Sequence, residues 1–163
     1  MINSIKKIQG FLLLSVLFIG CTKERGPLTD VKPAVPVTIT NATEYRPEPT
    51  VTVALSGTGA IQIILAIPSN SGHTIKEITK ASASTSYTQI QGSTGLYTST
   101  PITGDGLTVT FNTSLTEYFT KKPVSASNPA AKVNTELANR FYFAVTLDDG
   151  TVIYPEPVRI LVL

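Results

Sequence analysis

The sequence predicts an all-β domain, an antiparallel sandwich of two sheets with about seven to nine strands. Apolar residues recur at every second position in several short runs, which is the period of half-buried strands. Gly, Pro, Asn and Asp residues separate these runs, and no long stretch has the spacing of an amphipathic helix. Short strands joined by such turns bury their apolar faces by packing two sheets together.

Four segments in the first half of the chain show apolar alternation or an apolar run: residues 35–40, 51–55, 60–67 and 74–79. Residues 60–67 are more continuously apolar, which predicts a central strand. The spacing of Ile75 and Ile78 predicts an irregularity within the fourth segment. Residues 82–95 are rich in Ser, Thr, Gln and Gly, and we expect an edge strand and a loop there.

The second half repeats the pattern in residues 107–112, 141–147, 151–154 and 158–163. Residues 115–119 fit either a short strand or one helical turn, and the Pro- and Ser-containing residues 122–132 predict a loop. Asp149-Gly150 between two alternating runs is a strong signal for a β-hairpin. We expect Gly150 to adopt a positive φ, a region that Asp149 also tolerates.

The terminal hairpin carries a resemblance to a known fold. Phe141-Tyr142-Phe143-Ala144-Val145-Thr146-Leu147, followed by Asp149-Gly150-Thr151 and Val158-Arg159-Ile160-Leu161-Val162, is similar to the last hairpin of fibronectin type III and immunoglobulin-like domains. The resemblance implies that architecture for residues 35–163. The chain has no tryptophan and lacks the cysteine pair of a true immunoglobulin domain, and the fold implies no particular function.

The first 20 residues have the three parts of a secretory signal peptide. Lys6 and Lys7 precede the apolar residues 11–19, and the small residue Gly20 stands before Cys21. A membrane-spanning helix needs roughly 20 apolar residues. We therefore expect this segment to be removed rather than to anchor the chain.

Leu17-Phe18-Ile19-Gly20-Cys21 resembles the lipobox of bacterial lipoproteins, with Phe18 where leucine is usual. The resemblance implies that Cys21, the only cysteine, is acylated, that cleavage occurs before it, and that the lipid holds the protein to a membrane of the cell envelope. The next residues, Thr22-Lys23-Glu24-Arg25, resemble the export signal of Bacteroidota surface lipoproteins. This similarity implies the outer membrane and favours surface exposure.

The predicted organisation is a signal peptide at 1–20, a lipidated N-terminus and tether at 21–34, and the sandwich domain at 35–163. Pro27, Pro33 and Pro36 favour an extended tether, which at about 3.1 Å per residue reaches some 40 Å from the membrane. Without Lys6 and Lys7, eleven basic residues balance eleven acidic ones. A neutral domain with scattered cations lacks the basic surface of a nucleic-acid-binding protein.

The sequence offers no convincing catalytic set. His73 is the only histidine, and Ser56-Gly57-Thr58-Gly59 differs from the Gly-x-Ser-x-Gly nucleophile elbow. Glu117 and Glu136 are the pair of carboxylates that spacing leaves open for glycosidase chemistry, but nothing else nominates them. We expect a protein that is not an enzyme and needs no cofactor.

Acidic residues at glycine-containing turns raise the question of calcium. Asp105, Asp148 and Asp149 occupy such turns, without the Asp-x-Asp-x-Asp spacing of a calcium loop. We therefore expect ordinary turn chemistry and no metal site.

Two binding functions remain open. The first is a structural or protein-interaction module of the envelope that contacts a partner protein through an edge strand or loops, with residues 82–95 as the candidate edge. The second is an accessory glycan-binding surface lipoprotein of a polysaccharide-uptake system, which stacks sugars on aromatic rings. Most tyrosines are expected to pack on the sheets, and the candidates for outward-facing rings are Tyr45, Tyr87, Tyr97, Tyr118 and Tyr154.

Overall fold

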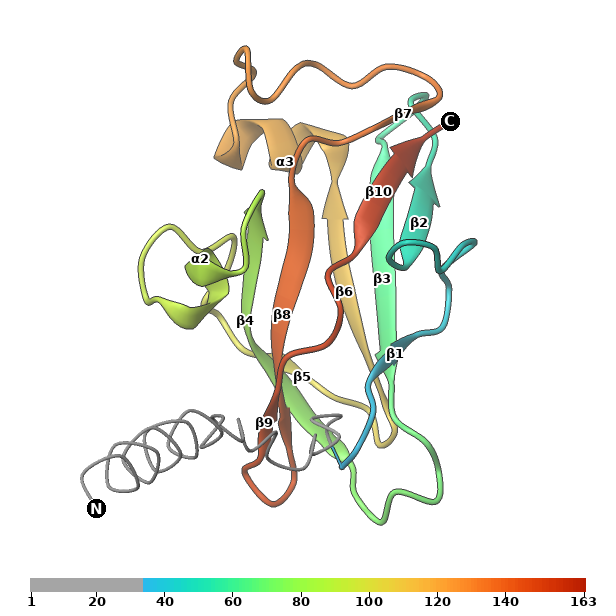
Figure 1. Cartoon of the computed structure of the whole chain (residues 1–163), viewed down its shortest axis with the longest axis vertical. Helices are drawn as coiled ribbons and strands as arrows, with labels where there is room; N and C mark the ends of the chain where they lie inside the picture. Colours follow the sequence, from blue (N-terminus) through green and yellow to red (C-terminus); the bar gives the residue numbers. More distant parts are fainter. Residues whose placement is uncertain (1–33) are drawn as a thin grey trace, which may run out of the picture. The chain divides into compact units, whose positions relative to one another are not determined.

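The structure is a computed structural model that describes residues 34–163. The predicted signal peptide, Cys21 and nearly all of the predicted tether lie outside the described residues. Strands dominate the domain (Figure 1). The elements are β1 (Thr38–Ile39), β2 (Thr50–Val53), β3 (Ala60–Ala66), β4 (Ile75–Ser84), α2 (Thr88–Gln91), β5 (Ile102–Thr103), β6 (Thr108–Ser114), α3 (Leu115–Lys121), β7 (Thr135–Glu136), β8 (Arg140–Leu147), β9 (Val152–Ile153) and β10 (Arg159–Val162).

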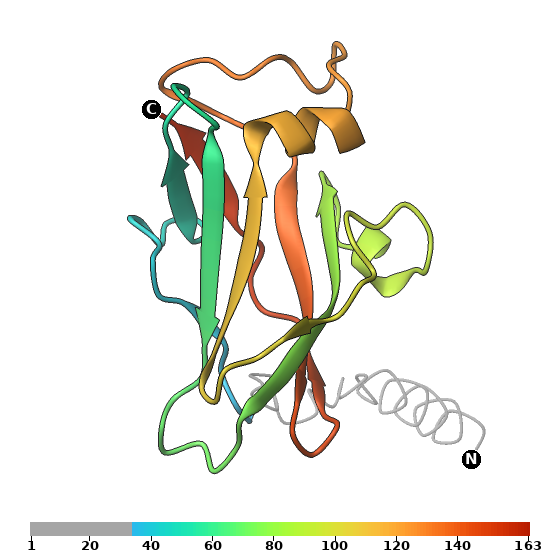
Figure 2. The same cartoon turned by 180° about the vertical axis from the view of Figure 1, so that it is seen from behind.

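The strands form three hydrogen-bonded sheets with the orders β1-β3-β6, β5-β4-β8-β9 and β2-β10-β7. All pairs are antiparallel except β2 and β10, which run parallel. A bridge between Phe141 and Val158 joins the last two sheets side by side. The chain is therefore an all-β, largely antiparallel sandwich, as the alternation predicts, with β3 and β6 visible behind β8 in Figure 1 and in front of it in Figure 2.

One core lies between the layers. Phe111 of β6 contacts Phe141 and Phe143 of β8, with ring centroids 5.6 and 5.2 Å apart. Tyr142 points to the other face of β8, where it packs with Ile90 of α2 in a small second cluster. The predicted register of the terminal hairpin is confirmed, because side chains alternate between the two faces of a strand.

Two prolines explain why three sheets are present where two were expected. Pro155 and Pro157 fall between β9 and β10, and neither has an N–H group to donate to a neighbouring strand. The last strand is consequently interrupted. Its first part is β9, which pairs with β8, and its second part is β10, which pairs with β2 and β7.

The expectation of an edge strand and a loop at residues 82–95 holds for the loop but not for a separate strand: residues 82–84 end the long strand β4, and residues 85–95 form turns and the short helix α2. Ser82 lies in β4, pairs with Tyr142 of β8 and is 0% exposed. Its neighbours Ala81 and Ala83 are buried in the core. Alanines fit between the layers without forming a conspicuous apolar run, so the sequence pattern understates how deeply this strand is buried.

The structure confirms one further local prediction and decides another that the sequence left open between a strand and a helical turn. Register shifts interrupt β4 after Ile75 and again after Ile78, which confirms the expected irregularity. Residues 115–119 belong to a helix, because the Ser114 hydroxyl accepts a hydrogen bond from the Glu117 N–H at 3.1 Å. Ser and Glu at this spacing are the signature of a helix start. The start of this helix is therefore readable in the sequence itself.

The terminal hairpin has a three-residue turn. The Leu147 N–H donates to the Thr151 carbonyl at 2.9 Å, and Gly150 has a φ of +85° as expected. Among the described residues, Asn134 is the only non-glycine with a positive φ, so Asp149 does not share the left-handed region with Gly150. A type I turn followed by a left-handed glycine is a common three-residue hairpin.

Candidate functional site

The predicted lipidation site is Cys21, which lies outside the described residues. Residues 34–163 contain two candidate sites. One is a polar cluster at the β8–β9 turn, and the other is a groove between the edges of two sheets.

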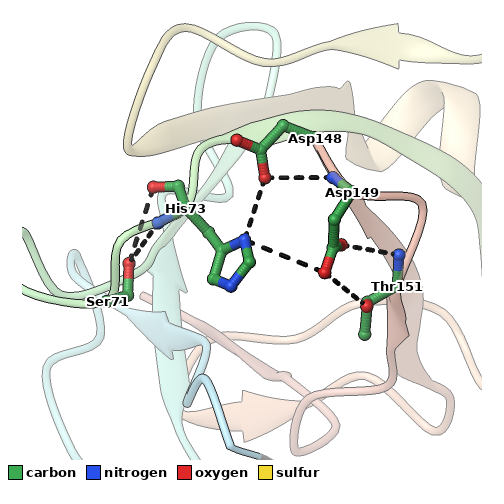
Figure 3. Close-up of polar contacts among 5 residues, drawn as sticks. All are labelled: Ser71, His73, Asp148, Asp149 and Thr151. Carbon is green, nitrogen blue, oxygen red and sulfur yellow. Dashed lines mark hydrogen bonds and ion pairs between the residues drawn. The ribbon is translucent and has the colours of Figure 1, made fainter.

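The polar cluster joins the β3–β4 loop to the β8–β9 turn (Figure 3). His73 Nδ1 lies 3.1 Å from Asp148 Oδ1 and 3.9 Å from Asp149 Oδ2. The N–H and hydroxyl of Thr151 donate to the two oxygens of Asp149 at 2.8 and 2.9 Å. These contacts connect two loops that are 75 residues apart in the sequence.

Hydrogen bonds favour the ionised form of both carboxyls. The His73 side chain contributes most to lowering the pKa of Asp148, and the Thr151 N–H contributes most to lowering the pKa of Asp149. One imidazole nitrogen and two carboxylates lie within 4.8 Å of one another. Calcium takes six to eight oxygen ligands, so this set does not match it. The structure assigns these groups a role in fixing the turn.

The other residues considered for catalysis have partners or lie in turns. Glu117 on α3 pairs with Lys121 at 2.8 Å, and Glu136 on β7 pairs with Arg159. Hydrogen bonding to Lys121 lowers the pKa of Glu117. Ser56 directly precedes Gly57, which has a φ of +70°, as expected for a turn serine. The structure therefore engages each glutamate in its own ion pair.

The groove lies where two sheet edges approach each other. One wall is β1 and the two residues before it, from the edge of the β1-β3-β6 sheet, and the other is Ile153 at the end of β9 with the connection to β10. Tyr45 and Pro49, from the β1–β2 connection, complete the lining. The groove encloses about 320 Å³, at the lower end of the range for small-molecule sites.

Two tyrosines give the groove exposed aromatic surface. Tyr45 is 53% exposed and Tyr154 is 41% exposed. The Tyr45 hydroxyl donates to the Ile39 carbonyl, which restrains its ring. Tyr154 packs edge-to-face on Tyr87 at 5.8 Å, and Tyr87 packs in the same way on Tyr142 at 6.0 Å. Both rings are thus held in place before any ligand binds.

The five tyrosines considered for outward positions divide into two groups. Tyr97 and Tyr118 are buried, and burial raises the pKa of each, that of Tyr97 to about 12. Tyr45, Tyr87 and Tyr154 are exposed. Glu156, which also lines the groove, was not among the sequence candidates. Its position beside Pro155 and Pro157 was the available signal, because prolines place it outside a paired strand.

Prolines also determine how the groove can be used. Pro36, Pro49 and Pro155 all line it, and none has a backbone N–H. An added strand needs a row of free backbone donors and acceptors, and proline at an edge prevents such pairing. The groove is therefore suited to side chains rather than to strand addition.

No family of known proteins, no curated protein and no solved structure matches the chain. None of the helices within residues 34–163 is long and apolar enough to cross a membrane.

Proposed function

We propose that the protein is a lipid-anchored, non-catalytic module of the bacterial cell envelope that binds a partner protein through the groove between β1 and β9. The observation that carries the proposal is the pair of restrained, exposed tyrosines on an otherwise mainly apolar groove. Aromatic rings with few rotatable bonds are favoured in protein interfaces, because they supply contact area at low entropic cost. Because prolines prevent a partner from adding a strand at these edges, we expect the partner to bind through side chains in the groove.

A glycan-binding function is the second candidate, and the exposed tyrosines are the feature that favours it. A sugar also presents several hydroxyls, each of which must exchange its water for a protein partner. Of the polar side chains in the groove, Thr38 donates to the Ala66 carbonyl and Tyr45 to the Ile39 carbonyl. This leaves the Tyr154 hydroxyl and Glu156 for a ligand. The shortage of hydrogen-bonding groups favours a protein segment over a glycan.

The pairing of the strands supports an immunoglobulin- or fibronectin III-like identity for the sandwich. With β1, β3 and β6 taken as the A, B and E positions of that architecture, and β4, β8 and β9 as the C, F and G positions, A, B and E fall in one sheet and C, F and G in the other. This division matches the two sheets of the immunoglobulin architecture. Such domains commonly act by contact, although the fold alone assigns no function.

The proposed anchor is a lipid on Cys21 in the outer membrane, with the tether giving the domain its reach. The lipobox resemblance and the proline-containing residues 22–36 support this part of the proposal. Shortening the tether by about ten residues should remove roughly 30 Å of span. We expect weaker capture of the partner and an unchanged melting temperature.

Photo-crosslinking on intact cells tests the proposed surface. A photoreactive amino acid is placed at Tyr154, inside the groove, and in a control at Val133, which is 53% exposed and precedes β7 at the other end of the sandwich. We expect one envelope protein to be captured from position 154 and not from position 133. Mass spectrometry of the crosslinked peptide then identifies the segment bound.

Three results would contradict the proposal. Capture of no protein at position 154, or the same capture at both positions, would exclude the groove as the contact surface. Hydrolysis of a glycan or peptide by the purified protein would exclude a non-catalytic role. Retention on a glycan resin that is lost in Tyr154→Ala, without any crosslinked protein, would favour the glycan-binding function.

A further inference from the structure

We infer that the groove receives an arginine or lysine side chain, carried by an extended segment of the partner protein. This inference rests on the proposed function and specifies the chemistry of the partner. Its support comes from the charge of the groove, the arrangement of its aromatic rings and the apolar character of its walls.

Glu156 gives the groove its charge. It is the only ionisable carboxylate in the lining, and the lining contains no cationic side chain. Within the described part of the chain, Glu48 and Glu136 are paired with Arg140 and Arg159, whereas Glu156, like Glu44 and Glu77, takes part in no ion pair. Glu156 is exposed, so it places a solvent-facing negative charge at the groove that a cationic side chain can approach.

Arg159, the nearest cation along the chain, is unavailable to Glu156. Its Nε donates to Glu136 at 2.7 Å, and a second guanidinium nitrogen donates to the other oxygen of the same carboxylate. This two-point contact links β10 to β7, which also pair as strands through Leu161 with Glu136 and Val162 with Thr135. Arg159 is therefore already engaged, and the Glu156 carboxylate is open to a cation from a partner.

The aromatic rings of the groove suit the same ligand. The face of a tyrosine ring attracts a cation within about 6 Å of its centre. The domain already contains such a contact, because Lys121 Nζ lies 4.4 Å from the centroid of Tyr97. Tyr45 and Tyr154 are restrained and exposed in the groove, so they offer this surface at little entropic cost.

The remaining lining accommodates the aliphatic part of the ligand. Arg and Lys side chains bury their methylene stems on apolar surface and leave the charged group at a polar site. Val37, Ile39 and Ile153 supply apolar surface of this kind, with prolines beside them. An acidic or phosphorylated segment would instead meet the uncompensated charge of Glu156.

Peptide mixtures with a fixed central residue test the inference without assuming the partner's sequence. Fluorescent hexapeptides carry Arg, Lys, citrulline or Glu at the centre and random Ala, Pro, Ser, Thr and Val at the other positions. Binding to the full-length protein in detergent is followed by fluorescence anisotropy. Citrulline keeps the shape of arginine but is neutral. We expect the Arg and Lys mixtures to bind about tenfold more tightly than the citrulline mixture, and the Glu mixture not to bind.

Matched variants locate the effect in the groove. Glu156→Gln should weaken the Arg mixture about threefold, as expected for an exposed ion pair, and leave the citrulline mixture unchanged, whereas Glu77→Gln on β4 should change neither. Tyr154→Ala should reduce binding of the Arg mixture, and Tyr154→Phe, which keeps the ring, should preserve it. Melting temperatures close to that of the wild type establish that these variants are folded.

Equal binding of the Arg and citrulline mixtures, no effect of Glu156→Gln, or no binding of any mixture would overturn the inference. These results are distinguishable from failure of the proposed function. A protein crosslinked at position 154 despite such a result would leave the groove as a contact surface with a different specificity. Displacement of the Arg mixture by neutral oligosaccharides such as maltohexaose, with no preference for charge, would favour a glycan instead.

Discussion

Truncation of Phe143 and Tyr142 to alanine should separate the two faces of β8 energetically. Phe143 is 1% exposed and its ring lies 5.2 Å from that of Phe111 across the core. Phe143→Ala should therefore cost about 3–5 kcal/mol of unfolding free energy, as expected for a large cavity in a packed core. Tyr142 is 6% exposed, but its cover is mainly the four-residue helix α2 and the neighbouring loop.

That cover can collapse onto the vacated space more easily than the sandwich core, so Tyr142→Ala should cost about 2 kcal/mol. Urea unfolding followed by far-ultraviolet circular dichroism measures both, because removing a tyrosine would alter a fluorescence signal in a chain without tryptophan. With a slope of about 2 kcal/mol per molar urea, the two midpoints should differ by about 1 M.

Tyr142→Phe is the control for this experiment. The hydroxyl of Tyr142 makes no hydrogen bond within the described residues, so its removal should change stability by less than about 0.5 kcal/mol. Equal midpoints for the two alanine variants, or a lower midpoint for Tyr142→Ala, would refute the assignment of the larger core to the Phe143 face.

The remaining predictions concern the anchor, the turns and the polar cluster. Labelled fatty acid should enter the wild-type chain and not Cys21→Ser, and equal labelling or a different mature N-terminus would contradict lipidation. Gly150→Val should lower the melting temperature because of its φ of +85°, with Gly150→Asn less harmful, while a chelator should have no effect if the turn binds no calcium. Gly104→Ala should destabilise by about 1–3 kcal/mol, since an added Cβ would lie 2.1 Å from the Ile75 carbonyl oxygen; a wild-type urea midpoint would refute this close approach. The hydrogen bond from His73 lowers the pKa of Asp148, so it stabilises the fold at pH values above about 4, where an unperturbed aspartate is ionised. This contribution is lost as the pH falls through the folded-state pKa of Asp148. The melting temperatures of the wild type and Asp148→Asn should accordingly differ at pH 7 and converge near pH 3, and a constant difference would contradict this role.

Local patterns in the sequence were sufficient to predict most of the longer strands and the terminal hairpin. Alternation at 141–147 placed Phe141 and Phe143 on one face and Tyr142 on the other, and both positions are confirmed. The positive φ of Gly150 was likewise predictable. These features depend on side-chain periodicity and turn chemistry, which act over only a few residues.

The candidate groove was only partly predictable. Tyr45 and Tyr154 were among the residues considered for aromatic surface, but the sequence could not distinguish them from the buried Tyr97 and Tyr118. Whether a tyrosine is exposed depends on what packs over it, and that cover comes from distant parts of the chain. The role of Glu156 became visible only with the structure.

The sequence by itself determined the β class of the domain, the alternating faces of its strands and the chemistry of its turns. Only the tertiary structure decided that Ser82 lies inside β4, that β2 pairs in parallel with β10, and that Tyr45 and Glu156 line one groove. These features arise from pairing between segments that are far apart in the chain. Local alternation specifies the faces of a strand but not which strand becomes its neighbour.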